Sequence, residues 1–393
     1  MFLPFTISPI QLLLLGLSLI FTIFLLSWYF TCFRALPRYR KSLRNDEIDY
    51  SNEQPAVSII VYASNEEENI INNLPIILSQ EYPQYEVIVV NDSSTDNSAD
   101  VLSAMEAQYE NLYQTFVPID TRNLSRKKLS LTLGIKAAKY DIILTTTANC
   151  QPQSNQWLAL MMRNFNDYTD VVIGYSHKDY NADRSGGKWF RSYDTVMSAS
   201  LYLSYAQRAK PYRGDGNNLA YRKHLFFDNK GFSNSLNLHF GDDDLFINQV
   251  ATRYNTRIEL SADSQIIAKY DDIASTHHEL KMRYDFTARY LNTSAKIMAS
   301  MASMSFLGLT LSCAAIVALG ITNIITISIA SLLWIGTVIA QIIIFRANAS
   351  VLQAPRLLFC IPFYAIMRPF INFRYKLQER STRKCNYTWQ RRQ

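Results

Sequence analysis

The chain has 393 residues, of which 48% are hydrophobic, and its 39 basic and 33 acidic residues give a formal net charge of +6. This length is enough for one catalytic-sized domain with additional elements. Because the basic residues gather beside apolar segments, the composition argues against nucleic-acid binding and for contact with a membrane.

Two parts of the chain are long, apolar and without charge, residues 1–33 and residues 297–345. A bilayer crossing needs about 20 apolar residues, so the first part is long enough for one crossing and the second for two. The predicted crossings are residues 10–33, 299–319 and 324–345. The first part lacks a basic start and an Ala-x-Ala site, which favours an uncleaved anchor over a signal peptide.

Three crossings and the positions of the basic residues predict the orientation of the chain. Gly320, Thr322 and Asn323 mark the turn between the last two crossings. Basic clusters follow the first crossing and fill the C-terminus, and Lys and Arg mark the cytoplasmic side of a membrane. We therefore expect the middle of the chain and its tail to be cytoplasmic. Segment 357–370 is short and contains two prolines, which favours an interfacial position.

The middle of the chain alternates strand-like and helix-like segments, which is typical of a mostly parallel sheet with right-handed crossovers. The predicted strands are 57–62, 85–91, 113–118, 141–146 and 171–174. The predicted helices are 65–79, 95–108, 126–139 and 154–165. There is no Gly-x-Gly-x-x-Gly and no Gly-Lys-Ser/Thr motif, so neither a dinucleotide fingerprint nor a P-loop is present.

Polar residues stand at the ends of adjacent predicted strands. Asn65 and Glu66 follow the first strand, and Asp92 ends the second, which is a run of four apolar residues before Asn91. Ligands of open α/β sheets bind at the carboxyl ends of the strands, so Asp92 is a candidate nucleotide ligand. The alternative is that Asp92 or a neighbouring serine caps the next helix.

Several segments in order resemble the membrane-anchored branch of the family-2 glycosyltransferases, which have a GT-A fold. The segments are 58–66, 90–96, 127–138, 214–222 and 241–246. The resemblance implies an α/β fold with a GT-A-type, mostly parallel sheet flanked by helices, plus N- and C-terminal transmembrane helices. It divides the chain into an anchor (1–45), a GT-A domain (54–275), an amphipathic interface helix (276–296), two transmembrane helices (297–345) and an interfacial segment with a basic tail (346–393).

By this resemblance, Asn65, Glu66 and Asp92 bind the donor nucleotide. Lys127 and Lys128 resemble the basic pair that neutralises the donor diphosphate, although an exposed basic turn would look the same. The glycine-rich loop is expected to contact the acceptor, unless it is a plain turn. Its candidate residues are Gly214, Gly216, Asn217 and Asn218.

The chain departs from the family at the metal motif, which is usually Asp-Ala-Asp. Thr147-Ala148-Asn149 stands there, so we interpret the motif as degenerate. Mg²⁺ and Mn²⁺ prefer anionic oxygen ligands, and Thr147 and Asn149 offer neutral ones. We therefore expect Mg²⁺ or Mn²⁺ binding to be weakened or absent. Cationic side chains could replace the metal, the metal could be recruited differently, or activity could be lost.

The acidic run at 242–244 resembles the motif that supplies the general base of inverting family members. The resemblance points to Asp242, with Asp243 as the alternative, and neighbouring acids are expected to raise at least one pKa. Arg289 stands where related synthases carry an arginine that meets the diphosphate, but it could equally bind lipid headgroups.

The sequence thus predicts a multi-pass membrane glycosyltransferase. Its expected partners are a nucleotide-sugar donor and a lipid, lipid-linked glycan or polysaccharide acceptor, and the transfer is expected to invert the anomeric configuration. The alternative is a catalytically degenerate homologue that binds a ligand or a partner without catalysis. A transporter is disfavoured, because the predicted crossings contain no charge.

Overall fold

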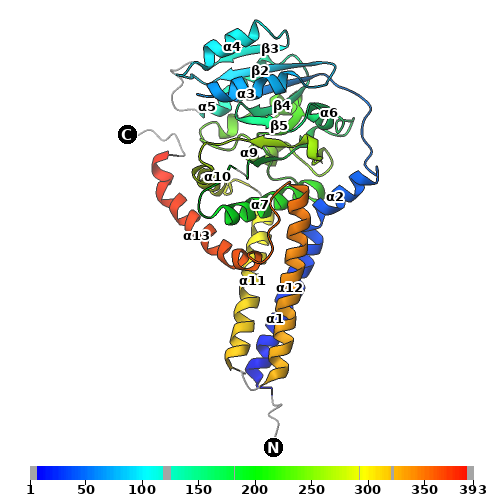
Figure 1. Ribbon diagram of the computed structural model, residues 1–393, viewed down its shortest axis with the longest axis vertical. Helices are drawn as coiled ribbons and strands as arrows, with labels where there is room; N and C mark the ends of the chain where they lie inside the picture. Colours follow the sequence, from blue (N-terminus) through cyan, green and yellow to red (C-terminus); the bar gives the residue numbers. More distant parts are fainter. Residues whose placement is uncertain (1–6, 118–124, 181, 292, 320–322, 387–393) are drawn as a thin grey trace, which may run out of the picture.

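The computed structural model describes residues 7–117, 125–180, 182–291, 293–319 and 323–386, which form a helical stalk below an α/β domain (Figure 1). The described part contains three helices that are long and apolar enough to cross a membrane. These are α1 (Pro9–Trp28), α11 (Thr293–Leu319) and α12 (Ile324–Val351). Their positions agree with the predicted crossings. Gly320 and Thr322 of the predicted turn lie outside the described residues, while Asn323 caps α12 by accepting a hydrogen bond from the Thr326 amide.

The first helix continues into the basic segment that we predicted to be cytoplasmic. Helix α1 passes through a π-helical turn (Tyr29–Phe33) into α2 (Ala35–Arg44). Ser8 and Gln11 form a capping box at the start of α1, which satisfies amide groups that have no partner inside the helix.

The α/β domain is built on a seven-stranded mixed sheet with the order β3-β2-β1-β4-β8-β6-β9. Its strands are β1 (Val57–Ala63), β2 (Tyr85–Asn91), β3 (Leu112–Phe116), β4 (Ile142–Thr147), β6 (Val171–Ile173), β8 (Leu219–Arg222) and β9 (Thr256–Ile258). Strands β1 to β4 are parallel, as predicted, whereas β8 runs antiparallel to both β4 and β6. A three-stranded sheet of β5 (Cys150–Pro152), β10 (Ile266–Ala268) and β7 (Ser176–Lys178) lies beside it.

Helices cover the sheet and connect its strands. They are α3 (Glu67–Leu78), α4 (Ser98–Glu106), α5 (Arg126–Ala137), α6 (Trp157–Met162), α7 (Lys188–Arg208), α8 (Lys223–Asp228), α9 (Asp244–Val250), α10 (Ile273–Thr287) and α13 (Ile361–Asn386). Short 3₁₀ turns occupy Ser233–Ser235 and Ala262–Ser264. Helix α10 lies where we predicted an interface helix over residues 276–296, and it ends at Thr287. The interfacial segment begins α13, which runs up beside α10 (Figure 1).

The central strands are buried on both faces, which explains their continuous apolar runs. In β1, Ile59 and Val61 pack on the side of α3 and α6, while Ile60 packs on the side of α5. Their burial contributes roughly 1.5–3 kcal/mol for each side chain.

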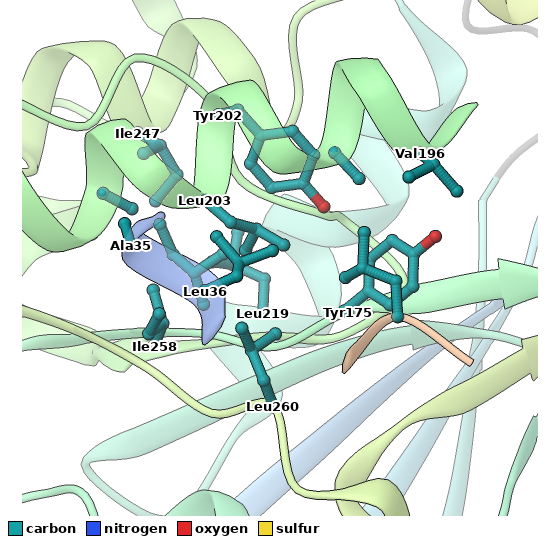
Figure 2. Packing of buried hydrophobic residues seen from close by; sticks show 14 of the residues in the cluster. Ala35, Leu36, Tyr175, Val196, Tyr202, Leu203, Leu219, Ile247, Ile258 and Leu260 are labelled. Atoms are coloured by element: carbon teal, nitrogen blue, oxygen red, sulfur yellow. The ribbon is translucent and has the colours of Figure 1, made fainter. Parts of the chain in front are cut away.

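One hydrophobic core joins the stalk to the α/β domain. It extends from Leu25 in α1 through α7 to the sheet. Figure 2 shows Leu36 of α2 packed among Leu203 of α7 and Leu219 of β8. Helix α7 is thus packed between the sheet and the stalk.

Candidate active site

A cavity of about 520 Å³ opens at the carboxyl ends of β1 and β4. The register of these parallel strands pairs Tyr62 with Thr147, which brings the loops that follow them to one edge of the sheet. The cavity is lined by Tyr62, Glu66, Lys127, Thr147, Asn149, Asp215, Gly216, Asn217, His239, Phe240, Asp243, Tyr270, Thr276, Glu279, Leu280, Arg283 and Tyr284. Segments predicted to form a site therefore do come together.

The residues after β1 and β2 have different roles. Glu66 lines the cavity, and burial raises its pKa against the opposing hydrogen bond from Asn69. Asn65 ties the two loops together, because its side-chain oxygen accepts a 2.7 Å hydrogen bond from the Thr95 amide. Asn65 also has a positive φ of 54°, a conformation that asparagine adopts more readily than most residues.

Asp92 is buried and already engaged within the protein. It accepts hydrogen bonds from the Tyr62 hydroxyl at 2.8 Å and from Nε of Arg126 at 2.7 Å. It lies outside the cavity lining, whereas Tyr62 is part of that lining. Asp92 therefore positions the side chain of Tyr62. The sequence alone did not single out Tyr62.

The two lysines at the start of α5 have different positions and different hydrogen-bond partners. Lys127 lines the cavity and its Nζ lies 3.0 Å from Oδ2 of Asp242. Lys128 has no exposed surface, and its Nζ donates to the carbonyl oxygens of Ser235, Leu238 and Phe240 and to the Ser235 hydroxyl. Lys128 thus holds the 235–240 loop in place and lies outside the cavity lining, whereas we expected it beside the diphosphate.

The residues at the expected metal motif are joined to one another. The Thr147 hydroxyl donates a 2.7 Å hydrogen bond to Oδ1 of Asn149, and the Asn149 amide donates to the Lys269 carbonyl at 2.8 Å. Both side chains line the cavity with neutral oxygens that already have partners. Within the described ranges, no group of three or more His, Cys, Asp or Glu side chains is placed to hold a metal. These residues do not fit a tightly held Mg²⁺ or Mn²⁺.

The glycine-rich loop contributes two of the four residues expected there. Gly216 and Asn217 line the cavity, and a Cβ on Gly216 would lie 3.2 Å from Cβ of Asp243. Asn218 is fully buried and binds the Trp157 indole and two backbone carbonyls. Gly214 packs against Ile247 and Leu219. Asn218 and Gly214 therefore support the loop and lie outside the cavity lining, whereas we expected them to contact an acceptor.

The acidic run shows three carboxylates in three environments. Asp243 lines the cavity and caps α9. Burial alone would raise the pKa of Asp242, but Arg283 and Lys127 outweigh it and hold this pKa well below its usual range. Burial and the charge of Asp243 raise the pKa of Asp244 to about 6, while Thr287 donates to its carboxylate. The expected raised pKa thus occurs, but at the acid that lies deepest.

Arg283 is the functional residue that sequence reasoning missed. Its guanidinium binds Asp242 and, at 3.0 Å, Oδ1 of Asp243. Arg289, which we expected near the diphosphate, instead pairs with Glu379 of α13. A helical spacing was available as a signal, because α10 lines the cavity with Thr276, Glu279, Leu280, Arg283 and Tyr284.

Part of the chain is similar to a known protein family. Residues 58–235 match the model of the family described as glycosyl transferase family 2. This match agrees with the family resemblance that the motifs predicted.

Two curated proteins are similar to parts of this chain. The chain is 30% identical over 93 residues to poly-beta-1,6-N-acetyl-D-glucosamine synthase of Staphylococcus epidermidis, covering 24% of this chain and 21% of that protein. It is 28% identical over 177 residues to the probable glycosyltransferase YdaM of Bacillus subtilis, covering 43% and 40%. The chain thus spans about two fifths or less of the length of these curated relatives.

The fold also matches a solved structure, the mannosyltransferase PcManGT from Pyrobaculum calidifontis in complex with GDP-Man and Mn²⁺. The two share 16% identity with a TM-score of 0.56, and the match covers 93% of this chain and 99% of that chain. This likeness confirms the predicted GT-A-type fold.

Proposed function

We propose that this protein is an active glycosyltransferase that binds a nucleotide-sugar donor in the cavity of about 520 Å³ and transfers the sugar to an acceptor hydroxyl. The observation that carries this proposal is the position of Asp243. It is the member of the acidic run that lines the cavity, and it faces the glycine loop at Gly216. A carboxylate in this position is available to a bound acceptor.

Asp243 serves as the general base in this mechanism, and Asp242 as its support. The Asp243 carboxylate takes the proton of the acceptor hydroxyl as the oxygen attacks the anomeric carbon. The bond from that carbon to the diphosphate breaks, and the diphosphate leaves with the electron pair, which inverts the configuration. Asp242 is a weaker base because Arg283 and Lys127 stabilise its charged form.

Lys127 and Arg283 supply the positive charge for the leaving diphosphate. Both line the cavity and both are anchored by Asp242, so their charges are held in place before the reaction. Glu66, Asp215 and Glu279 also line the cavity, so the diphosphate belongs at the end that Lys127 and Arg283 form. Because Thr147 and Asn149 do not fit a divalent cation, no step of this mechanism depends on one.

The reaction takes place at the cytoplasmic face of a membrane in this proposal. The helices that are long enough to cross a bilayer form the stalk below α7, and basic residues of α2 follow the first of them. Lys and Arg at this position favour the cytoplasmic side. The acceptor is therefore a lipid, a lipid-linked glycan or a growing polysaccharide that reaches the domain from the membrane.

A second candidate is a homologue that binds a nucleotide sugar without transferring it. The neutral oxygens of Thr147 and Asn149 favour this alternative, because they remove two charges from the expected motif. The two candidates differ in turnover and agree in binding.

Calorimetric titration of the full chain in detergent micelles with a panel of UDP- and GDP-sugars tests both. We expect one donor to bind with a dissociation constant of roughly 1 μM to 1 mM, the range of typical enzyme substrates. Binding followed by release of free nucleotide supports the glycosyltransferase. Binding without turnover, with all acceptors tried, supports the second candidate, and absence of binding across the panel contradicts both.

A further inference from the structure

A second cavity of about 150 Å³ adjoins the proposed donor cavity. It lies between the strands β7 and β10 on one side and the helices α7 and α10 on the other. The two cavities share the lining residues Asp215, Asn217, Tyr270, Leu280 and Tyr284. At roughly 30 Å³ for each water molecule, the second cavity has room for a group the size of a phosphate or a carboxylated carbon.

Lys178 gives this cavity a cation without a counterpart. Its side chain lines the cavity and is 8% exposed. Its Nζ makes no hydrogen bond or ion pair with any residue that the structure describes, and lies 6.0 Å from the centre of the Tyr270 ring. Burying an ammonium without a partner is costly, and burial lowers the pKa of Lys178 to about 8, so an anion bound beside Nζ would stabilise its charged form.

Arg213 adds a second cation to the same lining. Its guanidinium carbon lies 3.3 Å from the centre of the Tyr284 ring and 4.8 Å from that of Tyr202, so the group is held between two aromatic faces. Its buried Nε has no hydrogen-bond acceptor among the described residues. The tyrosine rings fix the position of this charge and leave its Nε without an acceptor.

The acids that line this cavity do not meet the needs of these two cations. Asp194 binds Lys281 at 3.0 Å and Arg368 at 2.7 Å. Asp215 accepts 2.7 Å hydrogen bonds from the amide and the hydroxyl of Ser176.

A third acid of the lining, Asp285, makes no ion pair with Lys178 or Arg213, and its buried Oδ2 has no hydrogen-bond partner among the described residues. Burial raises its pKa, while Lys281 and Lys376 oppose that shift. Because none of the three carboxylates forms an ion pair with Lys178 or Arg213 among the described residues, an external anion is the acceptor that these two cations lack.

The place of the cavity assigns this anion to the acceptor. Helix α7 turns Asp194, Ser198 and Tyr202 toward the second cavity. Its opposite side, at Met197 and Leu201, lines a small cavity against the helices of the stalk. The second cavity thus lies between the donor cavity and α7, on the side of the donor cavity that is nearer the stalk.

We propose that the second cavity binds an anionic group of the acceptor, a phosphate or a carboxylate, through Lys178 and Arg213. This assignment rests on the proposed glycosyltransferase function, since it names the acceptor class of that site. The acceptor is then an acidic glycan or a phosphate-bearing lipid-linked glycan, and a neutral sugar chain lacking both groups is a poor substrate.

Binding of small anions to the full chain in maltoside micelles, which contain no phosphate, tests the assignment. Inorganic phosphate and glucuronate are titrated separately by calorimetry into the unmodified chain, Lys178→Met and Lys210→Met. Lys210 is an exposed lysine and provides the matched control. We expect Lys178→Met to weaken anion binding at least about tenfold and Lys210→Met to leave it unchanged.

Replacing an unpaired buried ammonium with an apolar side chain does not remove a native contact, so Lys178→Met should fold at least as well as the unmodified chain. Preferential binding of phosphate identifies a phosphate-bearing acceptor, and preferential binding of glucuronate an acidic sugar. Absence of binding by both anions, or equal binding by Lys178→Met, overturns the assignment.

Nucleotide binding separates this proposal from the preceding one. The same preparations are titrated with the donor nucleotide diphosphate. We expect its affinity to be within about twofold of the unmodified chain in Lys178→Met, because Lys178 lies outside the donor cavity lining. A loss of nucleotide affinity in Lys178→Met would reassign the cavity to the donor, whereas a chain that binds anions but no nucleotide would contradict the proposed function alone.

Discussion

Arg283 of α10 donates a 3.0 Å hydrogen bond from Nη2 to Oδ1 of Asp243, and the same guanidinium binds Asp242. A single residue of α10 thus binds both Asp242 and Asp243, of which Asp243 lines the cavity. Helix α10 also contacts α13 and α7, which lie beside the stalk. The position of the proposed base is therefore linked to the elements nearest the membrane.

Replacing Arg283 should impair transfer through Asp243. We expect Arg283→Lys to lower transfer at least about tenfold, because a single ammonium cannot reproduce a guanidinium bound to two carboxylates. Arg283→Met should lower it further and shift the pH profile upward, since two adjacent acids lose their shared cation. Steady-state transfer rates measured across pH provide the test. Arg253→Met, at an exposed arginine, is the control, and an Arg283→Lys enzyme with an unaltered rate would contradict the role.

The two lysines of α5 should respond differently to the same substitution. Lys127→Met is expected to weaken binding of the nucleotide diphosphate about tenfold with little change in stability. Lys128→Met should leave buried carbonyl oxygens without a donor, at a cost of roughly 1–3 kcal/mol for each group. Thermal unfolding and nucleotide titration of both variants check this division. The reverse pattern would show that Lys128 is the diphosphate ligand.

Asp244 predicts a pH dependence of stability. Its pKa of about 6 lies above its usual value of 3.8, so its contribution is fully present below pH 3.8 and is lost as pH rises through 6. Asp244→Asn removes this titration and keeps an oxygen for the Thr287 hydroxyl. The variant should gain about 2 kcal/mol relative to the unmodified chain between pH 4.5 and pH 7.5. Chemical unfolding at both pH values measures the difference, and parallel curves would rule out the raised pKa.

Restoring the two expected carboxylates should create a metal requirement. Thr147→Asp combined with Asn149→Asp places two anionic oxygens where the native residues bind each other. We expect the unmodified chain to retain most of its transfer in EDTA, and the double variant to bind Mn²⁺ at least about tenfold more tightly. Manganese titration and transfer in chelator measure the two effects. Equal metal affinity in both proteins would argue that these positions do not correspond to the family's metal motif.

The sequence predicted those elements whose residue pattern can be recognised within the element itself. Strands β1, β2 and β4 are apolar runs buried on both faces, and the three crossings are long uncharged segments. Helix α7 was not predicted, because it is buried on several sides between sheet and stalk and shows no simple amphipathic pattern. Strand β8 was not predicted either and falls within the segment interpreted as the glycine loop. It has four residues, and its partners β4 and β6 are distant in the sequence.

The site was predictable to the level of loops and not of side chains. The loops at Glu66, Lys127, Thr147, Gly216 and the acidic run do surround one cavity. Which neighbour faces inward depends on tertiary packing, as with Lys127 and Lys128, which are adjacent in the chain and differ completely in burial. Arg283 was missed because its role depends on how α10 is rotated against the sheet.

The measurement that tests the central claim most directly is sugar transfer by Asp243→Asn beside Asp263→Asn, with donor affinity determined in the same preparations. Asp263 is exposed and provides an isosteric control. Loss of a general base typically lowers the rate about 10²- to 10⁴-fold, so Asp243→Asn should show this loss while binding the donor normally. Full transfer activity in Asp243→Asn would contradict the account.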